Sequence, residues 1–305
     1  MVKVSVIVPS MIREDQLTRT MDSLSRQTLK DFEVILVGDG APHYEVLDEK
    51  IKVIDGSGEA KGSARNKGLE SAGGDYIYFL EAGDEVEPGL LEDNLSLAEE
   101  NDADLLVFGQ VHPDLPTQRD FRIHFGEYYQ ETEDGLGNKL YKREFLKKNE
   151  IRFTDQDIGE DALFNLSAYR EIQRVYFNPH AYHHRFQRKE TCQPMRFEWD
   201  YQVAKKLEEL ILYWGLEKEY KFLIDKGYWL PVYKELQGLA SKDCPLSYQE
   251  KKKRLQEILR DAKISQSLTA LEKHSTLSSF SKVILNLLQR NKLFRAMLLF
   301  KIKLS

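Results

Sequence analysis

The sequence predicts an α/β fold in which a mostly parallel sheet is flanked by helices and followed by a helical C-terminal region. Two runs, "VKVSVIV" and "FEVILVG", are rich in β-branched residues and show almost no polar alternation, which is typical of strands covered on both faces. Between them, "EDQLTRTMDSLSRQ" places Leu17, Met21 and Leu24 at helical spacing. Beyond Arg196 the strand signals stop and aromatic-rich helical patterns take over. Strand–helix alternation of this kind specifies parallel strands with helices on both sides.

The expected elements follow one another in order up to Gly109. Strands are expected over residues 2–8, 32–38, 51–55, 75–80 and 103–109. Helices are expected over 14–27, 62–74 and 88–101, the second closed by glycines and the third opened by Pro88. From Pro113 to Asn149 the pattern weakens into loops, charge and aromatics, before a helix over 160–172 and a strand over 175–186.

The change of character near Arg196 predicts two domains. We expect an α/β domain over residues 1–195 and a helical region over 196–305. Within the second, Ser247 and Glu250 have the spacing of a capping box, which predicts a helix start there.

Composition excludes several classes of protein. The formal net charge of -6 over 305 residues argues against a nucleic-acid footprint across the surface. The two cysteines, Cys192 and Cys244, have no CxxC spacing, so neither a disulfide framework nor a zinc site is expected and a reducing compartment is indicated. The N-terminus lacks the pattern of a signal peptide, and no apolar run approaches the ~20 residues that span a bilayer. We expect a cytoplasmic protein.

Carboxylates stand where several expected strands end. In open parallel sheets, ligands bind outside the carboxyl ends of the strands. The first strand runs into "VPSM", the second into "VGDGAP" and the fourth into "LEAGDEVEPG". Neither GxGxxG nor GxxxxGK[ST] follows the first strand, so the usual phosphate-binding loops are missing. A nucleotide could still bind if one carboxylate accepts a base N–H and another holds a cation that neutralises a diphosphate.

The order of these motifs resembles family 2 of the inverting glycosyltransferases, which have the GT-A fold. The resemblance rests on "VSVIVPS", "LSRQTLKDFEVILVGDGAP" and "GSARNKGLESAGGDYIYFLEAGDEVEPG", and continues through "NKLYKREFLKKNEIRF", "GEDALFNLSAYRE" and "YHHRFQRKET". It covers roughly residues 2–191 and does not extend to the helical region.

The resemblance implies which residues contact the donor. Asp39 takes the place of the second Asp of the family's "DDGS" turn, which reads the uracil or other base, while Gly38 replaces the first Asp. Lys61 and Arg65 of "KGSARN" lie in a segment that usually lies near the donor, and Pro9 ends the first strand. Arg185 of "YHHR" is a further candidate for the phosphates.

The same resemblance implies a site for a divalent metal, Mg²⁺ or Mn²⁺. The family's "DSDD" segment reads Glu81, Ala82, Gly83 and Asp84 here, so a glycine replaces the Asp that most often touches the metal. We expect Asp84 as ligand and Glu81 as helper, because such a cation needs only one or two carboxylates beside water and phosphate oxygens. His183 and His184 are candidates for a late metal ligand.

The resemblance places the general base at Asp161, the second residue of an "ED" pair with Glu160. The helix N-terminus would keep Asp161 ionised, whereas its like-charged neighbour would raise the pKa of Asp161. The sequence does not decide between the two.

The last segment combines cations with a broad apolar face and contains no acidic residue. Its basic residues are Lys282, Arg290, Lys292, Arg295, Lys301 and Lys303. This pattern is typical of a helix on an anionic membrane surface, so contact through residues 275–305 is one interpretation. Packing on its own domain or on a second subunit is the other.

Together these features predict a cytoplasmic, metal-dependent glycosyltransferase, peripheral on the inner membrane face if the last segment binds lipid. It would move a sugar from a nucleotide sugar, a UDP-sugar by family habit, to a hydroxyl of a glycan, lipid-linked or protein-linked acceptor in cell-surface polysaccharide or glycoconjugate synthesis. The first rival is a catalytically impaired relative that binds a partner, which Gly38 and Gly83 favour and Asp161 opposes. A nucleotidyltransferase is disfavoured because "PSMIREDQ" lacks glycines. Whether the chain forms a homo-oligomer is left open.

Overall fold

The computed structural model describes residues 1–10, 14–38, 50–56, 58–109, 117–131, 135–155, 159–186, 197–274 and 277–304. The chain divides into two compact units, Met1–Arg188 and Lys189–Ser305. The domain boundary expected from the sequence, between residues 195 and 196, falls outside the described residues.

The first unit contains a seven-stranded, mostly parallel sheet with the strand order β3-β2-β1-β4-β7-β6-β8. The strands are β1 (Val4–Ser10), β2 (Phe32–Gly38), β3 (Ile51–Asp55), β4 (Tyr76–Phe79), β6 (Leu105–Phe108), β7 (Lys139–Lys142) and β8 (Val175–Asn178). All neighbouring pairs are parallel except those that β7 makes with β4 and β6. Because β2 and β4 flank β1 on opposite sides, the strand order reverses between β1 and β4, which is where ligands of such sheets bind.

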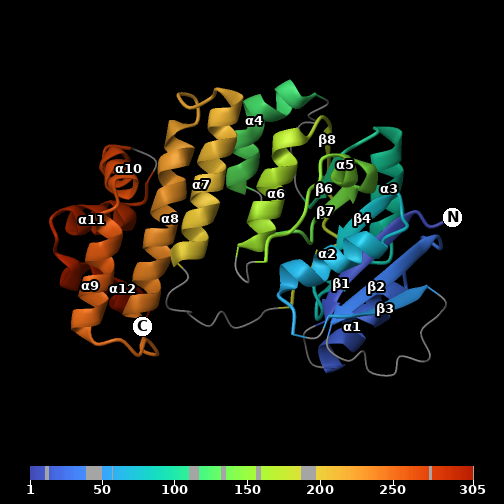
Figure 1. Cartoon of the computed structure of the whole chain (residues 1–305), viewed down its shortest axis with the longest axis horizontal. Helices are drawn as coiled ribbons and strands as arrows, with labels where there is room; N and C mark the ends of the chain where they lie inside the picture. The colour runs from blue at the N-terminus through green and yellow to red at the C-terminus, as the bar shows by residue number, and fades with distance from the viewer. Residues whose placement is uncertain are drawn as a thin grey trace. The chain divides into compact units, whose positions relative to one another are not determined.

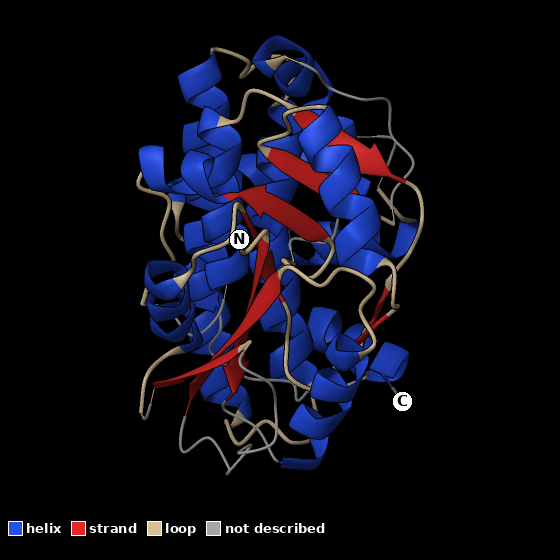
Figure 2. Cartoon of the chain, turned by 90° about the vertical axis from the view of Figure 1, so that its right-hand side faces the viewer, coloured by secondary structure: helices blue, strands red, loops and turns tan. Residues whose placement is uncertain are grey.

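Helices cover both faces of this sheet, so the α/β prediction is confirmed (Figures 1 and 2). On one face, α1 (Glu14–Ser25) and α3 (Leu90–Glu100) share a hydrophobic core with Val4, Val6 and Val8 of β1. On the other face, α2 (Lys61–Ser71) crosses β1 so closely that a methyl group on Gly68 would lie 2.5 Å from Ile7. The remaining helices of the unit are α4 (Gln118–Glu131), α5 (Arg143–Lys148) and α6 (Glu160–Glu171).

The structure corrects the expectation of loops between Pro113 and Asn149. Helix α4, helix α5 and the antiparallel strand β7 lie in this segment. Phe121, Phe125 and Tyr128 of α4 are almost fully buried, and the Tyr128 ring packs edge-on against Tyr169 of α6. Burial of these rings against α6 therefore stabilises α4.

The strand expected over 175–186 is also wrong as a single element. It is divided into β8 and the two-residue strand β9 (His183–His184), with Pro179 between them. Strand β9 leaves the large sheet and pairs antiparallel with β5 (Glu85–Val86), directly after the acidic loop.

The second unit is helical, as expected. It comprises α7 (Phe197–Trp214), α8 (Lys221–Ala240), α9 (Tyr248–Leu259), α10 (Ala262–Glu272), α11 (Ser279–Gln289) and α12 (Leu293–Leu304). Helix α7 ends just before Gly215, whose φ of +69° favours glycine. The capping box of Ser247 and Glu250 is present at the start of α9.

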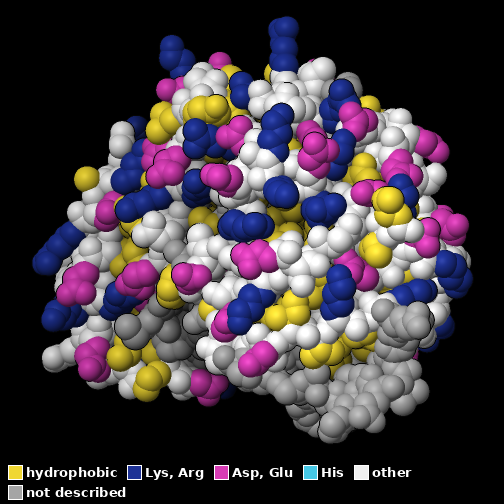
Figure 3. Space-filling view, turned by 45° about the vertical axis from the view of Figure 1, so that its right-hand side comes forward, with side chains coloured by type: hydrophobic (Ala, Val, Ile, Leu, Met, Phe, Trp, Pro, Cys, Tyr) yellow, Lys and Arg dark blue, Asp and Glu magenta, His cyan; other side chains and the backbone are white. Residues whose placement is uncertain are grey.

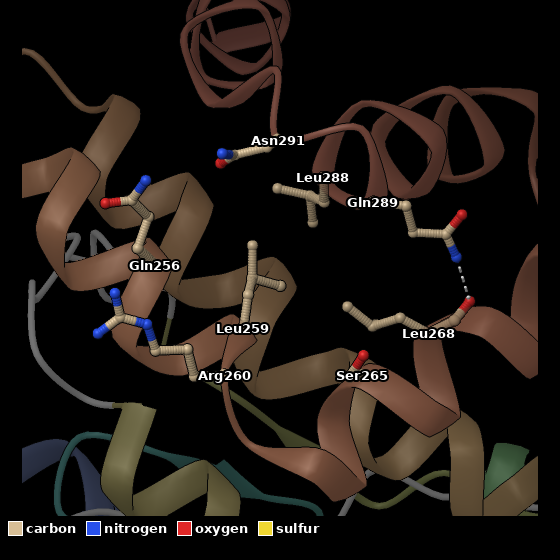
Figure 4. A pocket seen from close by; sticks show the side chains of 8 residues that line it. All are labelled: Gln256, Leu259, Arg260, Ser265, Leu268, Leu288, Gln289 and Asn291. Carbon is tan, nitrogen blue, oxygen red and sulfur yellow. Dashed lines mark hydrogen bonds between the residues drawn. The ribbon is translucent and has the colours of Figure 1, made fainter.

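The described surface of the helical unit is hollowed in more than one place. A groove of about 330 Å³ lies among α9, α10 and α11, where Gln289 Nε2 donates to the Leu268 carbonyl at 3.2 Å (Figure 4). None of the residues predicted for the site lines this groove. Figure 3 shows basic and acidic side chains interspersed over the face that it presents. Among the described residues, no helix is long and apolar enough to cross a membrane.

Candidate active site

The acidic loop after β4 is held in place by Thr20 of α1. The Gly83 N–H donates to Thr20 Oγ1 at 2.9 Å, and Thr20 Oγ1 donates to the Asp84 carbonyl at 2.8 Å. Gly83 has a φ of +103°, which L side chains rarely adopt. The glycine that replaces the family's aspartate is therefore required by the path of this backbone.

Strand β9 brings a histidine to this loop. Val86 pairs with His183 and Glu85 with His184, so the two histidines point to opposite faces of the ribbon. His183 Nε2 lies 2.8 Å from Asp84 Oδ2, with only 7% and 8% of the two side chains exposed. The other carboxylate oxygen, Asp84 Oδ1, accepts the N–H of Phe186 at 2.9 Å. His184, by contrast, is 63% exposed and lies 3.3 Å from Glu87.

Arg65 connects the acidic loop to the start of α6. Its side chain is 1% exposed, and its Nη2 lies 2.5 Å from Glu81 Oε1. Its Nη1 lies 3.0 Å from Glu160 Oε1 and 2.8 Å from Asp161 Oδ1. Burial disfavours the charged guanidinium, yet the carboxylates of Asp161, Glu81 and Glu160 raise the pKa of Arg65. We call Arg65, Glu81, Glu160, Asp161 and Lys61 the Arg65 cluster.

Glu81 shares its carboxylate between the two cations of α2. Its Oε2 lies 2.9 Å from Lys61 Nζ, while its Oε1 contacts Arg65. Burial would raise the pKa of Glu81, but the charges and hydrogen bonds of Arg65 and Lys61 lower it to about 2. Glu81 is thus ionised and already neutralised by protein cations.

The pKa of Asp161 is displaced in the opposite direction. Burial among protein atoms raises it to about 7, with Arg65 opposing the rise and Glu160 and Glu81 adding to it. The sequence analysis weighed the helix N-terminus against the neighbouring Glu160, but desolvation makes the largest contribution to the pKa of Asp161. Since 31% of the Asp161 side chain remains exposed, a bound hydroxyl could still reach it.

A second set of contacts fixes α2 against the chain before α6. Asn66 Nδ2 donates to the Phe153 carbonyl and Asn66 Oδ1 accepts the Phe153 N–H, both at 2.9 Å. The Arg65 guanidinium lies 5.1 Å from the centre of the Phe153 ring, which stacks on Phe164 of α6 at 4.1 Å. The packing of Phe153 therefore holds both the guanidinium and α6.

The structure brings most of the predicted site residues to the carboxyl edge of the sheet. Glu81 and Asp84 belong to one turn, in which the Asp84 N–H donates to the Glu81 carbonyl at 3.1 Å. Pro9 is buried near the end of β1, opposite Val37. Asp39 lies outside the described residues.

Arg185 and His184 are predicted site residues with exposed side chains, and His184 lies beside Glu87. Arg185 is exposed, and a methyl group on Gly135 would meet its Nη2 at 2.7 Å. Sequence reasoning missed Thr20, Asn66 and Phe153, which hold the acidic loop and α2 in place. Thr20 has the helical spacing of Leu17, Met21 and Leu24, which is the sequence signal that it lies on the buried side of α1.

The model of the glycosyl transferase family 2 matches residues 5–171, which include the sheet, the acidic loop and the start of α6. The chain belongs to this family. The matched segment contains every residue of the Arg65 cluster.

Individual family 2 members resemble the chain over part of their length. This chain is 34% identical over 198 residues to the uncharacterized glycosyltransferase EpsJ of Bacillus subtilis, and the match covers 56% of this chain and 57% of EpsJ. The chain spans 34% to 60% of the length of the first curated relatives it matches.

Two solved structures show that the fold is GT-A. S. aureus TarS 1-349 in complex with UDP matches with a TM-score of 0.63 and 20% identity, over 98% of this chain and 90% of TarS 1-349. The mannosyltransferase PcManGT from Pyrobaculum calidifontis, in complex with GDP-Man and Mn²⁺, matches with a TM-score of 0.52 and 15% identity, over 98% of this chain and 87% of that chain.

Proposed function

We propose that this family 2 member is an inverting glycosyltransferase that moves a sugar from a nucleotide sugar to an acceptor hydroxyl, with Asp161 as general base. The observation that carries the proposal is the Arg65 cluster. In it, a buried guanidinium joins Asp161 to the loop that begins at Glu81 and contains Asp84.

The environment of Asp161 suits proton abstraction. Inversion requires the acceptor hydroxyl to lose its proton as it attacks the anomeric carbon from the face opposite the leaving diphosphate. A carboxylate whose pKa is about 7 combines an ionised fraction near neutral pH with useful basicity, which is what general-base catalysis requires. Arg65 fixes the carboxylate, so it acts as a positioning residue.

The predicted metal fits the pair formed by Asp84 and His183. Asp84 Oδ2 is an oxygen ligand of the kind that Mn²⁺ and Mg²⁺ prefer. His183 Nε2, hydrogen-bonded to it at 2.8 Å, is a nitrogen that a transition metal such as Mn²⁺ would accept if the cation replaced this hydrogen bond. The described residues contain no group of three or more His, Cys, Asp or Glu that could hold a metal, so the proposed cation would have to complete its shell with phosphate oxygens and water. When bound, the metal would neutralise charge on the departing diphosphate. The presence of Mn²⁺ with GDP-Man in the PcManGT structure supports a divalent metal beside the donor.

Glu81 has a different role in this proposal from the one expected from the sequence. Its two oxygens contact Arg65 and Lys61, so we assign it to holding these cations and leave metal binding to Asp84 and His183. The Lys61 side chain is 33% exposed at the N-terminus of α2, where it and the helix end could approach the donor phosphates.

A UDP-sugar donor and a cell-surface acceptor are the finer parts of the proposal. The TarS complex contains UDP, and the curated S. aureus TarS, a poly(ribitol-phosphate) beta-N-acetylglucosaminyltransferase, is 25% identical over 202 residues. We propose a glycan, lipid-linked or protein-linked acceptor. We also propose a cytoplasmic location, which the small number of cysteines supports, with peripheral contact to the inner face of the membrane.

Donor hydrolysis tests the proposal without knowledge of the acceptor. Purified chain is incubated with a panel of UDP- and GDP-sugars, with and without Mn²⁺, and release of nucleoside diphosphate is measured. Metal-stimulated release that Asp161→Asn reduces, while thermal-shift assays still detect donor binding, supports the transferase. Donor binding without any release from any sugar nucleotide would indicate the impaired, partner-binding relative.

A further inference from the structure

Helix α12 carries a second apolar face in addition to the one that packs on its own unit. Leu293, Ala296, Met297 and Phe300 are buried at 2%, 0%, 7% and 1% exposure. On the other side, Phe294, Leu298 and Ile302 are 58%, 44% and 63% exposed. Their i, i+4, i+8 spacing places them in one stripe along the helix. Large apolar side chains aligned in this way mark an interaction surface more often than single exposed residues do.

Cations border this stripe. With about 100° between successive helical residues, Arg295 falls on one side of the stripe and Lys301 on the other, and both side chains are exposed. Lys303 is directed elsewhere, because its Nζ lies 3.0 Å from Tyr233 Oη and above the Phe280 ring at 4.5 Å. From Lys273 to Ser305 the chain has no Asp or Glu.

An aromatic ring of α9 extends the stripe. Tyr248 is 47% exposed, and its ring lies 5.6 Å from that of Phe294. One turn further along α9, Lys252 is exposed. Tyrosine prefers the boundary between apolar and aqueous phases, so the apolar stripe has a half-exposed aromatic and further positive charge at its edge.

We propose that the Phe294–Leu298–Ile302 face of α12 binds the surface of a membrane rich in anionic lipid. The apolar stripe would enter the boundary between headgroups and acyl chains, and Arg295 and Lys301 would extend to the lipid phosphates. Charge complementarity favours this occupant over a second copy of the chain. A copy would place the same cations against each other, whereas each Lys or Arg near an anionic surface strengthens binding.

Vesicle flotation of the full chain tests the proposal. We expect it to float with phosphatidylglycerol–phosphatidylcholine vesicles but not with phosphatidylcholine alone, and to be released by high salt. Arg295→Gln/Lys301→Gln should weaken binding about tenfold or more. Phe294→Gln/Leu298→Gln/Ile302→Gln should abolish it at the same lipid concentration.

A control variant distinguishes binding through this face from nonspecific hydrophobic binding to lipid. Leu212→Gln/Leu230→Gln removes apolar side chains of the same unit that are 49% and 45% exposed, and it should float like the parent chain. All positions changed are at the surface, and unchanged thermal melting will show that each variant folds. Absence of flotation of the parent chain, or equal flotation of the triple variant, would overturn the proposal. Concentration-dependent dimerisation that the triple variant abolishes, without lipid binding, would assign the face to a second copy and also overturn it.

Discussion

Arg65 Nη1 lies 2.8 Å from Asp161 Oδ1, although α2 and α6 are far apart in the sequence. The same guanidinium contacts Glu81, three residues before Asp84. Arg65 therefore joins the two segments that the proposed reaction needs in one place.

Asp161→Asn should abolish sugar transfer while leaving donor binding nearly intact. Asparagine keeps the shape of the side chain but cannot accept the proton at the attacking oxygen, so we expect the rate to fall by about 10²–10⁴. Rates of transfer or donor hydrolysis are measured together with donor affinity. Asp155→Asn, which changes an exposed carboxylate near the same helix start, serves as the control. Unchanged activity of Asp161→Asn would remove this residue from the mechanism.

The pH dependence of kcat/KM should report the pKa of Asp161. Activity should rise with pH through a midpoint of about 7, because the carboxylate must be ionised to act as base. Glu81 raises this pKa and Lys61 lowers it, so Glu81→Gln should shift the midpoint to lower pH and Lys61→Gln to higher pH.

Lys67→Gln is the control for these shifts, since Lys67 lies on the same helix but pairs with Glu59. Its midpoint should match that of the parent chain. Shifts of Glu81→Gln and Lys61→Gln in the same direction would contradict the assignment of the midpoint to Asp161.

The raised pKa of Asp161 also makes a prediction for stability. A carboxyl group whose pKa is higher in the folded than in the unfolded state favours folding when protonated, and that stabilisation is lost as pH rises from about 4 through 7. Asp161→Asn should therefore stabilise the fold more at pH 8 than at pH 5, by about 1–2 kcal/mol after allowance for solvent screening. Thermal or urea unfolding at the two pH values measures the difference, and an equal effect at both would argue against a displaced pKa.

Removal of metal should act through Asp84 and His183. Chelation should lower donor hydrolysis, and His183→Ala should raise the Mn²⁺ concentration for half-maximal activity by about 10–100-fold. His184→Ala provides the matched control, because His184 is exposed and lies next to Glu87. A larger effect at His184 than at His183 would refute this choice of ligand.

Restoring the family's aspartate should not improve the metal site. The φ of +103° at Gly83 disfavours any L residue, so Gly83→Asp should cost about 1–2 kcal/mol of unfolding free energy. Metal affinity measured by calorimetry should stay the same or fall. A gain in affinity without loss of stability would mean that the loop accommodates the change.

The regular elements were largely predictable, because their determinants are local. Strands β1 and β2 are apolar runs, and Leu17, Met21 and Leu24 define the buried side of α1. Helix α4 was missed although Phe121, Phe125 and Tyr128 have helical spacing, because charged and polar neighbours surround them in the sequence. Their burial against Tyr169 shows that the helical spacing of the aromatic residues, and not the polar neighbours, determines the local structure.

The sequence predicted several residues of the site but not the contacts between them. Motif order indicated Glu81, Asp84, Glu160 and Asp161, but not that Arg65 would contact three of these carboxylates. Nor did it indicate that desolvation would determine the pKa of Asp161. Both depend on how deeply α2 packs against the segment at Phe153, which is a property of the tertiary fold.

The pairing of β5 with β9 directs His183, and not the adjacent His184, toward Asp84. A slip of one residue would exchange the faces of His183 and His184, and the imidazole presented to the carboxylate would then be the other one. The alignment of β9 with β5 therefore determines which histidine faces Asp84, and the Phe186 N–H bound to Asp84 and the buried Val86 both maintain that alignment.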